Sequence, residues 1–219
     1  MKTQSFFDFG DKDEVISITS NDCKPFLLNI HYLRRMPNIV FAFGLIRNGN
    51  LVGVCTYGIP ASNSLCEGVS GKENRANVFE LNRLVLLPEC EKNKASILVS
   101  KSLSMLPRRK VIVSYADTAW GHIGYIYQAT NWLYTGMTKE RTDAFSNGLH
   151  SRTFRGDKNI RQTRSAKHRY VFFTGTPRDK KIMRKQLKYP VLEYPKGTSH
   201  NYDLKNPIPV QEQKIYKKQ

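Results

Sequence analysis

The stretch Val78-Phe-Glu-Leu-Asn-Arg-Leu-Val-Leu-Leu87 decides the fold of this 219-residue chain. It starts with alternating apolar and polar residues and then becomes continuously apolar, which is the pattern of a strand buried in the centre of a sheet. Pro88 ends the strand because proline has no amide hydrogen for the ladder. A sheet therefore forms the core, and the flanking segments must supply its other strands.

Before this strand the sequence predicts a short strand, a helix and a β-hairpin. The short strand is Glu14–Ile18, and apolar residues at helical spacing follow in Lys24–Leu33, ending before Pro37. The hairpin strands are Ile39–Ile46 and Leu51–Tyr57, joined by an Asn-Gly pair that supplies the positive φ angles of a tight turn.

After the central strand, helical and apolar segments alternate. Helices are expected at Lys92–Leu106 and Ile123–Leu133, with a strand at Lys110–Tyr115 between them. Residues 58–76 are rich in Gly, Ser and Asn, and this composition predicts a loop. The order predicts an α/β (α+β) fold, with a mixed twisted sheet flanked by helices.

The carboxyl-terminal part is strongly basic: residues 138–219 carry 20 Lys and Arg against 7 Asp and Glu, within a net charge of +17 for the chain. Such an excess indicates a nucleic acid as partner, because each basic group that neutralises a phosphate releases counterions. A basic tail that only keeps the chain soluble is the alternative. We expect here one strand at His168–Thr174, a basic helix at Arg178–Lys188, and an extended or mobile Pro-rich end from Tyr189.

The four cysteines, Cys23, Cys55, Cys66 and Cys90, lie far apart, so buried thiols are favoured over a zinc or disulfide framework. No run reaches the roughly 18 uncharged apolar residues of a membrane span, and the start lacks the apolar core of a signal peptide. A soluble intracellular protein without membrane contact is expected.

The order of elements resembles the GNAT acyltransferase fold. Phe79–Met105 then corresponds to the unit in which the phosphates of the acyl donor meet the amino end of a helix, where free amides and the helix dipole favour an anion. The donor-binding residues implied are Leu86, Lys92, Asn93, Lys94, Ala95 and Ser96. Ile97 departs from the small residue of the family, which weakens the match to coenzyme A.

Three further segments are more specific, namely His31-Tyr-Leu-Arg-Arg-Met-Pro37, Glu80-Leu-Asn-Arg-Leu84 and Ser114-Tyr-Ala-Asp-Thr118 followed by Gly121–Asn131. Through them the chain resembles the Mom family of phage DNA-modification proteins. The resemblance implies an enzyme that converts adenine in DNA to a carbamoylmethyl derivative on its exocyclic nitrogen and so protects phage DNA from host restriction. The resemblance covers roughly residues 26–143, and it implies double-stranded DNA as partner and the cytoplasm of the infected bacterial host as location. The order of elements along the chain predicts three regions: a lead-in (1–22), a GNAT-like catalytic domain (23–175) and a basic helix with a Pro-rich tail (176–219).

The product of that family constrains the acyl donor. An acetyl group lacks the nitrogen of a carbamoylmethyl group, so acetyl-coenzyme A alone cannot supply it. A glycyl group has the required atoms, and its amine can attack ring carbon 6 through a five-membered spiro intermediate to complete an isomerisation. Glycyl-tRNA is therefore the hypothesised donor, with tRNA as a second partner and acetyl-coenzyme A as the alternative donor.

The resemblance implies a catalytic set of His31, Tyr32, Asp117 and Tyr127, supported by Ser114, Asn82 and His122. Tyr127 takes the place of a general acid, and Asp117 accepts a proton from the adenine amine or orients that amine. His31 is expected as base or metal ligand, and His31, Tyr32 and Asp117 as an iron site. The alternatives are a buried bonded tyrosine, a satisfied helix histidine and an aspartate that caps the next helix.

An adenine must leave the base stack to be modified, and this requires a pocket with an aromatic or apolar wall. Candidates for the wall are Tyr115, Trp120 and Trp132, with core packing as the alternative for Trp132. Phosphate contacts are assigned to Arg34, Arg35, Arg161, Arg164, Lys167 and Arg169. The rival functions are an acetyltransferase acting on an amine or a protein and a non-catalytic basic DNA-binding protein. Formation of a homodimer stays open.

Overall fold

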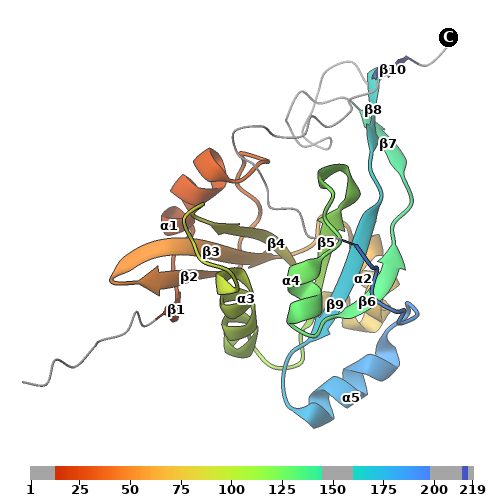
Figure 1. The fold of residues 1–219 in the computed structure, drawn as a ribbon. Helices are drawn as coiled ribbons and strands as arrows, with labels where there is room; N and C mark the ends of the chain where they lie inside the picture. The colour runs from red at the N-terminus through yellow and green to blue at the C-terminus, as the bar shows by residue number, and fades with distance from the viewer. Residues whose placement is uncertain (1–12, 145–159, 198–213, 217–219) are drawn as a thin grey trace, which may run out of the picture.

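A mixed seven-stranded sheet forms the centre of the molecule (Figure 1). The computed structural model describes residues 13–144, 160–197 and 214–216. The strand order is β1-β2-β3-β4-β5-β9-β6, and β4 and β5 are the parallel pair. The strands are β1 Glu14–Ser17, β2 Phe41–Arg47, β3 Asn50–Gly58, β4 Val78–Leu86, β5 Val111–Asp117, β6 Leu133–Met137 and β9 Lys167–Phe173. The central position predicted for the 78–87 strand is confirmed.

The two parallel strands separate after a short ladder. Val78 pairs with Val111, and Glu80 with Val113 is the last of three register pairs between β4 and β5 in the described part of the chain. Beyond that point β5 continues to Asp117 along β9, while β4 continues along β3 with a register shift at Thr56. The sheet therefore opens between β4 and β5 toward the carboxyl ends of both strands.

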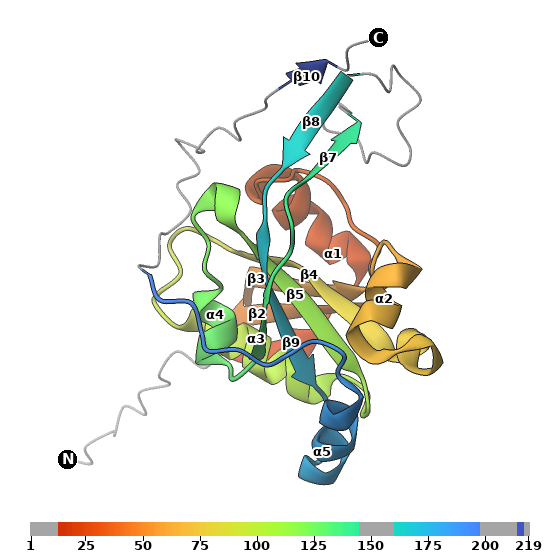
Figure 2. The same cartoon turned by 90° about the vertical axis from the view of Figure 1, so that its right-hand side faces the viewer.

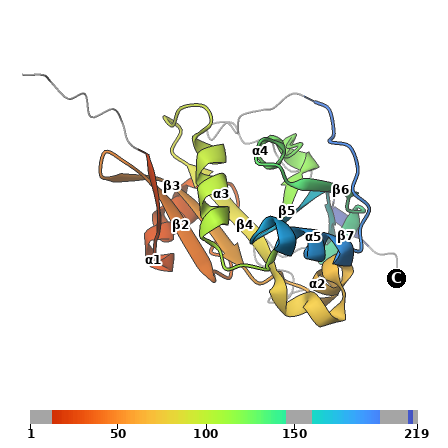
Figure 3. The same ribbon diagram turned by 90° about the horizontal axis from the view of Figure 1, so that it is seen from below.

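Helices cover both faces of this sheet (Figure 3). They are α1 Ser20–Pro25, the π-helix η1 Phe26–Ile30, α2 Asn63–Ser70, the 3-10 turns η2 Lys72–Asn77 and η3 Thr118–Trp120, α3 Lys94–Met105, α4 Tyr125–Ala129 and α5 Pro177–Gln186. Leu98 and Leu103 of α3 pack with Ile112 on one face, together with α4. Val69 of α2 and Met183 of α5 pack on the other face, where α1 and η1 form a third cluster.

Three local expectations were wrong in detail. Residues 58–76 hold α2 and η2 instead of a loop, because Cys66 and Val69 give the segment a buried helical face. The helix expected to extend to Leu33 ends at Ile30, before His31 takes an extended conformation with ψ of 135°. The helix expected at Ile123–Leu133 is reduced to α4, because Gly124 and Asn131 take positive φ angles on either side of it.

The carboxyl-terminal segments also attach to this sheet. A second sheet, in the order β10-β8-β7 (Lys214–Tyr216, Ile160–Arg164 and Arg141–Ala144), projects beyond the end at which β5 stops (Figure 2). Residues 188–197 follow in an extended course, with the amide of Leu192 bonded to the carbonyl of Tyr134 and the hydroxyl of Tyr194 to the carbonyl of Trp132. Among the described segments, no helix has the length and apolar character needed to cross a membrane.

Candidate active site

Ser114 bridges the opening between β4 and β5. Its Oγ lies 2.8 Å from the carbonyl oxygen of Leu81 and 2.7 Å from Oη of Tyr127. A serine hydroxyl has one proton, and the carbonyl can only accept, so Ser114 donates to Leu81 and Tyr127 donates to Ser114. Ser114 and Tyr127, each predicted for the site, are therefore brought together at the place where the strands separate.

Tyr127 keeps its proton at neutral pH. Burial raises the pKa of its phenol, and the nearby Tyr32 and Glu80 raise this pKa further. The ring packs against Trp132 and Tyr170, each with a centroid distance of 5.1 Å. A protonated, positioned phenol is suited to the general-acid role predicted for it.

Glu80 lies across the opening from Tyr127, and sequence reasoning did not single it out. Phe79 and Leu81 belong to the core under α3, so Glu80 between them lies on the α1 and α2 face. Burial raises the pKa of its carboxyl group, while Arg83 and Lys167 act in the opposite direction. No separate sequence signal distinguished Glu80, because Asn82 and Arg83 are polar residues of the same strand and burial is seen only in the structure. A buried acid with a raised pKa is a functional-site candidate.

Asp117 is an anchored carboxylate. It accepts hydrogen bonds from the amide of Ala119 at 3.1 Å and from the hydroxyl of Ser165, and it forms an ion pair with Lys167. The bond to Ala119 is the helix-capping role that was the structural alternative, here at the start of η3. With these partners Asp117 is better suited to positioning than to accepting a proton. Lys167, expected on DNA phosphates, instead contacts Asp117.

His31 is held as a neutral hydrogen-bond donor. The amide of Leu33 donates to Nδ1 of His31 at 3.0 Å, so the proton of the neutral ring resides on Nε2. Burial lowers the pKa of His31 to about 3, with contributions from Arg83, Arg35 and His122. The expected role as general base is therefore corrected, because Nε2–H can donate but has no lone pair to accept a proton.

The same geometry does not fit the expected iron site. Nδ1 of His31 is used by a backbone amide, and the Asp117 carboxylate is used by Lys167 and Ser165. Among residues 13–144 and 160–197, no three His, Cys, Asp or Glu side chains lie together as a metal site requires. The ligand set His31, Tyr32 and Asp117 thus finds no support.

Aromatic rings join η1 to the turn after β5. The rings of His31 and Tyr32 stack at 4.3 Å, and those of Tyr32 and Trp120 lie 4.8 Å apart. Trp120 remains a candidate wall for a base. Trp132 is fully buried, and Tyr115 packs in the cluster formed with α2 and α5, so these two aromatic residues belong to the core.

Asn82 and His122 have supporting positions. Asn82 accepts from the Thr56 hydroxyl at 2.6 Å and donates to the carbonyl of Asn38 at 2.8 Å, so its amide fixes the strand where the register shifts. The amide of His122 donates to the carbonyl of Asp117 at 3.2 Å, and burial lowers the pKa of its ring. Asn82 therefore has a structural role, and His122 lies beside Asp117.

The loop before α3 offers less positive charge to a donor than expected. Nζ of Lys94 forms ion pairs with Asp13 at 2.5 Å and with Glu91 at 3.4 Å. Asn93 takes a left-handed conformation with φ of 70° and gives no side-chain cap to the helix. The structure places all six expected residues, Leu86, Lys92, Asn93, Lys94, Ala95 and Ser96, between the end of β4 and the first turn of α3. The neutralised Lys94 agrees with the weak coenzyme A motif.

The basic residues assigned to DNA lie in different environments: some are held by contacts within the protein and others are exposed. The guanidinium of Arg169 donates to Thr135 Oγ1 at 3.0 Å and to its carbonyl at 2.8 Å, and it lies 3.4 Å from the ring centroid of Tyr189. These contacts make Arg169 structural and remove it from the DNA set. Arg34 is exposed after η1, while the side chain of Arg161 lies outside the described residues.

Comparison with known proteins identifies the family. The model of the Mom protein family matches residues 13–196. The chain belongs to the Mom family. Methylcarbamoylase mom of Escherichia phage Mu is 29% identical over 111 residues, covering 48% of this chain and 46% of that protein, so the chain matches about half the length of this curated relative.

Solved acetyltransferases resemble this Mom-family chain in fold. The ribosomal-protein-S18-alanine N-acetyltransferase of Escherichia coli is 8% identical, with a TM-score of 0.47, over 75% of this chain and 96% of its own. A GNAT acetyltransferase of Bacillus cereus is 12% identical, with a TM-score of 0.45, over 75% and 99%. The strand order itself confirms the predicted α+β fold with a mixed sheet flanked by helices.

Proposed function

We propose that this chain transfers a glycyl group from glycyl-tRNA to the exocyclic nitrogen of adenine in DNA and yields carbamoylmethyladenine. Membership of the Mom family over residues 13–196 carries the proposal. The relative from phage Mu is named a methylcarbamoylase, which supports this chemistry. Protection of phage DNA from restriction, in the cytoplasm of an infected bacterium, follows from the same proposal.

The opening between β4 and β5 separates two chemical roles. Ser114 and Tyr127 approach it from the face covered by α3 and α4, where the donor would lie. Glu80 lies on the opposite face of β4, and His31 directly follows η1, which packs on that face; the adenine would lie there. The two substrates then meet at the gap without sharing a binding surface.

In the transfer step, the adenine nitrogen attacks the glycyl carbonyl carbon, and the ester bond to the tRNA ribose breaks. Glu80 accepts the proton that the nitrogen loses, and Tyr127 gives a proton to the departing ribose oxygen. The Nε2–H of His31 donates a hydrogen bond to the carbonyl oxygen as its negative charge develops. Asp117, held by Lys167, positions the turn that bears Trp120.

A rearrangement then gives the final isomer. The free glycyl amine attacks ring carbon 6, and the original exocyclic nitrogen leaves as part of the amide. The glycine nitrogen is then bonded to the purine, and the former adenine nitrogen is the carboxamide. No atom is gained or lost after transfer.

The test uses purified protein, plasmid DNA, tRNA, glycyl-tRNA synthetase and glycine labelled with heavy nitrogen. Mass spectrometry should show an adenosine enlarged by C2H3NO and carrying the label. Acid hydrolysis of the carboxamide should release unlabelled ammonia and keep the label on the purine. Unlabelled product, or product formed only with acetyl-coenzyme A, would overturn the glycyl-tRNA donor.

A further inference from the structure

Helix α5 presents a positively charged face to solvent. Five of its ten residues are basic, and Asp179 is its one acidic residue. Asp179 and Met183 are buried and define the inner face of the helix. With about 3.6 residues per turn, the basic side chains opposite these two point outward, and all of them are exposed: Arg178, Lys181, Arg184 and Lys185. The outer face therefore carries charge of one sign.

The acidic residue of α5 is paired inside the fold and does not neutralise this face. Asp179 accepts hydrogen bonds from Nε of Arg108 at 2.9 Å and from Nε of Arg109 at 2.8 Å. The two arginine side chains remain 64% and 69% exposed, so two cations share one carboxylate at the start of α5. Together the exposed basic side chains form the α5 surface, which consists of Arg108, Arg109, Arg178, Lys181, Arg184 and Lys185.

The α5 surface does not stabilise the helix itself. Lys181 lies three residues before Arg184 and four before Lys185, and like charges at these spacings repel and destabilise a helix. A helix face that only meets solvent commonly alternates acidic and basic residues, which form ion pairs along it. Among the described residues, the ion pairs of α5 involve Asp179 alone. The outer face is therefore suited to an anion from outside the chain.

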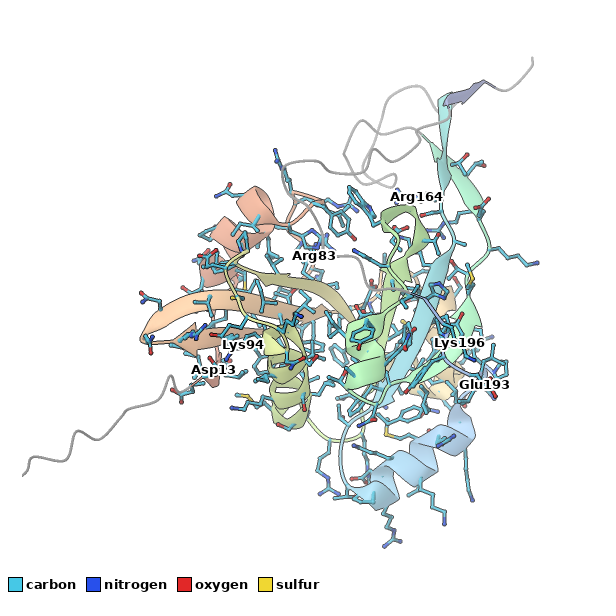
Figure 4. All side chains as sticks on the ribbon, in the orientation of Figure 1. Asp13, Arg83, Lys94, Arg164, Glu193 and Lys196 are labelled. Carbon is cyan, nitrogen blue, oxygen red and sulfur yellow. The ribbon has the colours of Figure 1, made fainter. Side chains whose placement is uncertain are left out.

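The α5 surface lies at the end of the sheet opposite Trp120. Helix α5 follows β9 near the start of β5, where the amide of Thr174 donates to the carbonyl of Lys110 at 3.0 Å. The seven residues of β5 then span roughly 20 Å up to Asp117. Figure 4 shows Arg164 at one end of the sheet and α5 at the other, with side chains that extend away from the sheet. A ligand that reaches both the opening and this surface must therefore be long.

Contacts lead from α5 to the donor side of the opening. Nζ of Lys180 lies 4.7 Å from the ring centroid of Phe172, which packs against the cluster under α3. The rings of Phe172 and Trp132 lie 5.6 Å apart, and those of Trp132 and Tyr127 lie 5.1 Å apart. The loop that bears Arg108 continues directly from the end of α3. The α5 surface therefore borders the face on which the donor is proposed to bind.

We propose that the α5 surface binds backbone phosphates of the tRNA donor while the glycyl end of that tRNA occupies the opening. The inference rests on the proposed function and deepens it by giving the donor a second binding surface. Lysine and arginine contacts with phosphates position a nucleic acid without reading its sequence, so they suit the body of a tRNA.

A tRNA fits the α5 surface better than the DNA does. Tyr32, which precedes the expected DNA contacts Arg34 and Arg35, lies against Trp120 with the two rings 4.8 Å apart. The DNA is therefore expected about the length of β5 away from α5. Two polyanions repel each other, and this repulsion weakens with distance, so surfaces at opposite ends of the sheet allow both to be bound at once.

The experiment measures binding of a glycine tRNA transcript, and separately of a duplex DNA, to the full chain over a series of salt concentrations. Lys181→Gln and Lys185→Gln should each reduce the salt slope of tRNA binding by about one, and the double variant by about two. The double variant should also weaken tRNA binding about tenfold and bind the duplex as the wild type does. Lys24→Gln is the matched control, because it removes one exposed charge from α1.

A kinetic measurement separates binding from chemistry. With glycyl-tRNA as donor, the double variant should raise the KM for glycyl-tRNA about tenfold and keep the single-turnover rate at saturating donor, because the α5 surface does not touch the reacting atoms.

Three binding results would overturn the proposal. They are a loss confined to duplex DNA, equal losses for tRNA and DNA, and equal losses in the α5 variants and Lys24→Gln, which would reflect net charge alone. Because the binding assay needs no product, tRNA binding that depends on Lys181 and Lys185 without any transfer of glycine would count against the proposed function alone.

Discussion

Tyr127 Oη lies 2.7 Å from Ser114 Oγ, whose own proton is committed to the carbonyl of Leu81 2.8 Å away. The three oxygens form one chain with a fixed direction, and the chain crosses the gap where β4 and β5 stop pairing. The phenol proton of Tyr127 is therefore held in a hydrogen bond to Ser114, beside the point where donor and acceptor would meet.

Replacement of Tyr127 by Phe should lower the single-turnover rate of DNA modification by about 10²- to 10⁴-fold, the usual contribution of a general acid. Ser114→Ala should have a smaller effect, because the phenol and its proton remain. Tyr194→Phe is the matched control, since its hydroxyl bonds the carbonyl of Trp132, away from Ser114. Equal rates for Tyr127→Phe and Tyr194→Phe would remove the phenol from the mechanism.

Glu80 should impose a pH dependence on the reaction. Burial raises the pKa of its carboxyl group, so the modification rate should rise with pH through a midpoint above the ordinary value of about 4.3. Glu80→Gln should lose this rise and most of the activity. A rate profile that rises identically in Glu80→Gln would assign the proton acceptor to another group.

The same carboxyl group should affect stability with a defined sign. Since its pKa is higher in the folded than in the unfolded chain, the folded state binds more protons between these two pKa values. The free energy of unfolding should therefore fall as pH rises through that interval. Urea unfolding of the wild type and Glu80→Gln across this range should show the fall in the wild type alone.

Much of the fold was predictable because it depends on local pattern. Apolar alternation located β4, and Asn48 and Gly49, with φ of 50° and 77°, confirmed the tight turn between β2 and β3. Strand β6 was missed: it follows α4 after only three residues, and the predicted helix extended to its first residue, Leu133. Tertiary contacts, and not local sequence pattern, set the strand conformation of the β6 residues.

The candidate site was only partly predictable, because several of its contacts join residues that local sequence pattern does not connect. The resemblance located Tyr127, Ser114 and Asp117. The tautomer of His31, however, is set by the hydrogen bond from the Leu33 amide, which depends on the turn after η1. The partner of Asp117 lies 50 residues away on β9, which no spacing rule could connect. Glu80 was within a quoted motif and became distinctive only when its burial was known.

Loss of Lys167 should destabilise the protein more than loss of the whole ion pair. Lys167→Ala leaves the Asp117 carboxylate, with a side chain 12% exposed, without its cation, and this should cost about 1–3 kcal/mol. The double variant Asp117→Ala with Lys167→Ala should regain part of that stability, because no unpaired charge remains. Strict additivity of the two losses in chemical denaturation would show that the pair is not coupled.

In contrast to Arg35, which stays a predicted contact of DNA phosphates, Arg169 is held by contacts within the protein. Its guanidinium is held by Thr135 and stacked on Tyr189, so Arg169→Ala should lower the melting temperature by disconnecting β6 and the extended segment from β9. The salt dependence of DNA binding should keep its slope, whereas Arg35→Ala should reduce that slope by about one. Thermal unfolding and binding across a salt series measure both effects. A reduced slope for Arg169→Ala at unchanged stability would return this residue to the DNA interface, because it would show that the contacts to Thr135 and Tyr189 yield when a phosphate is near.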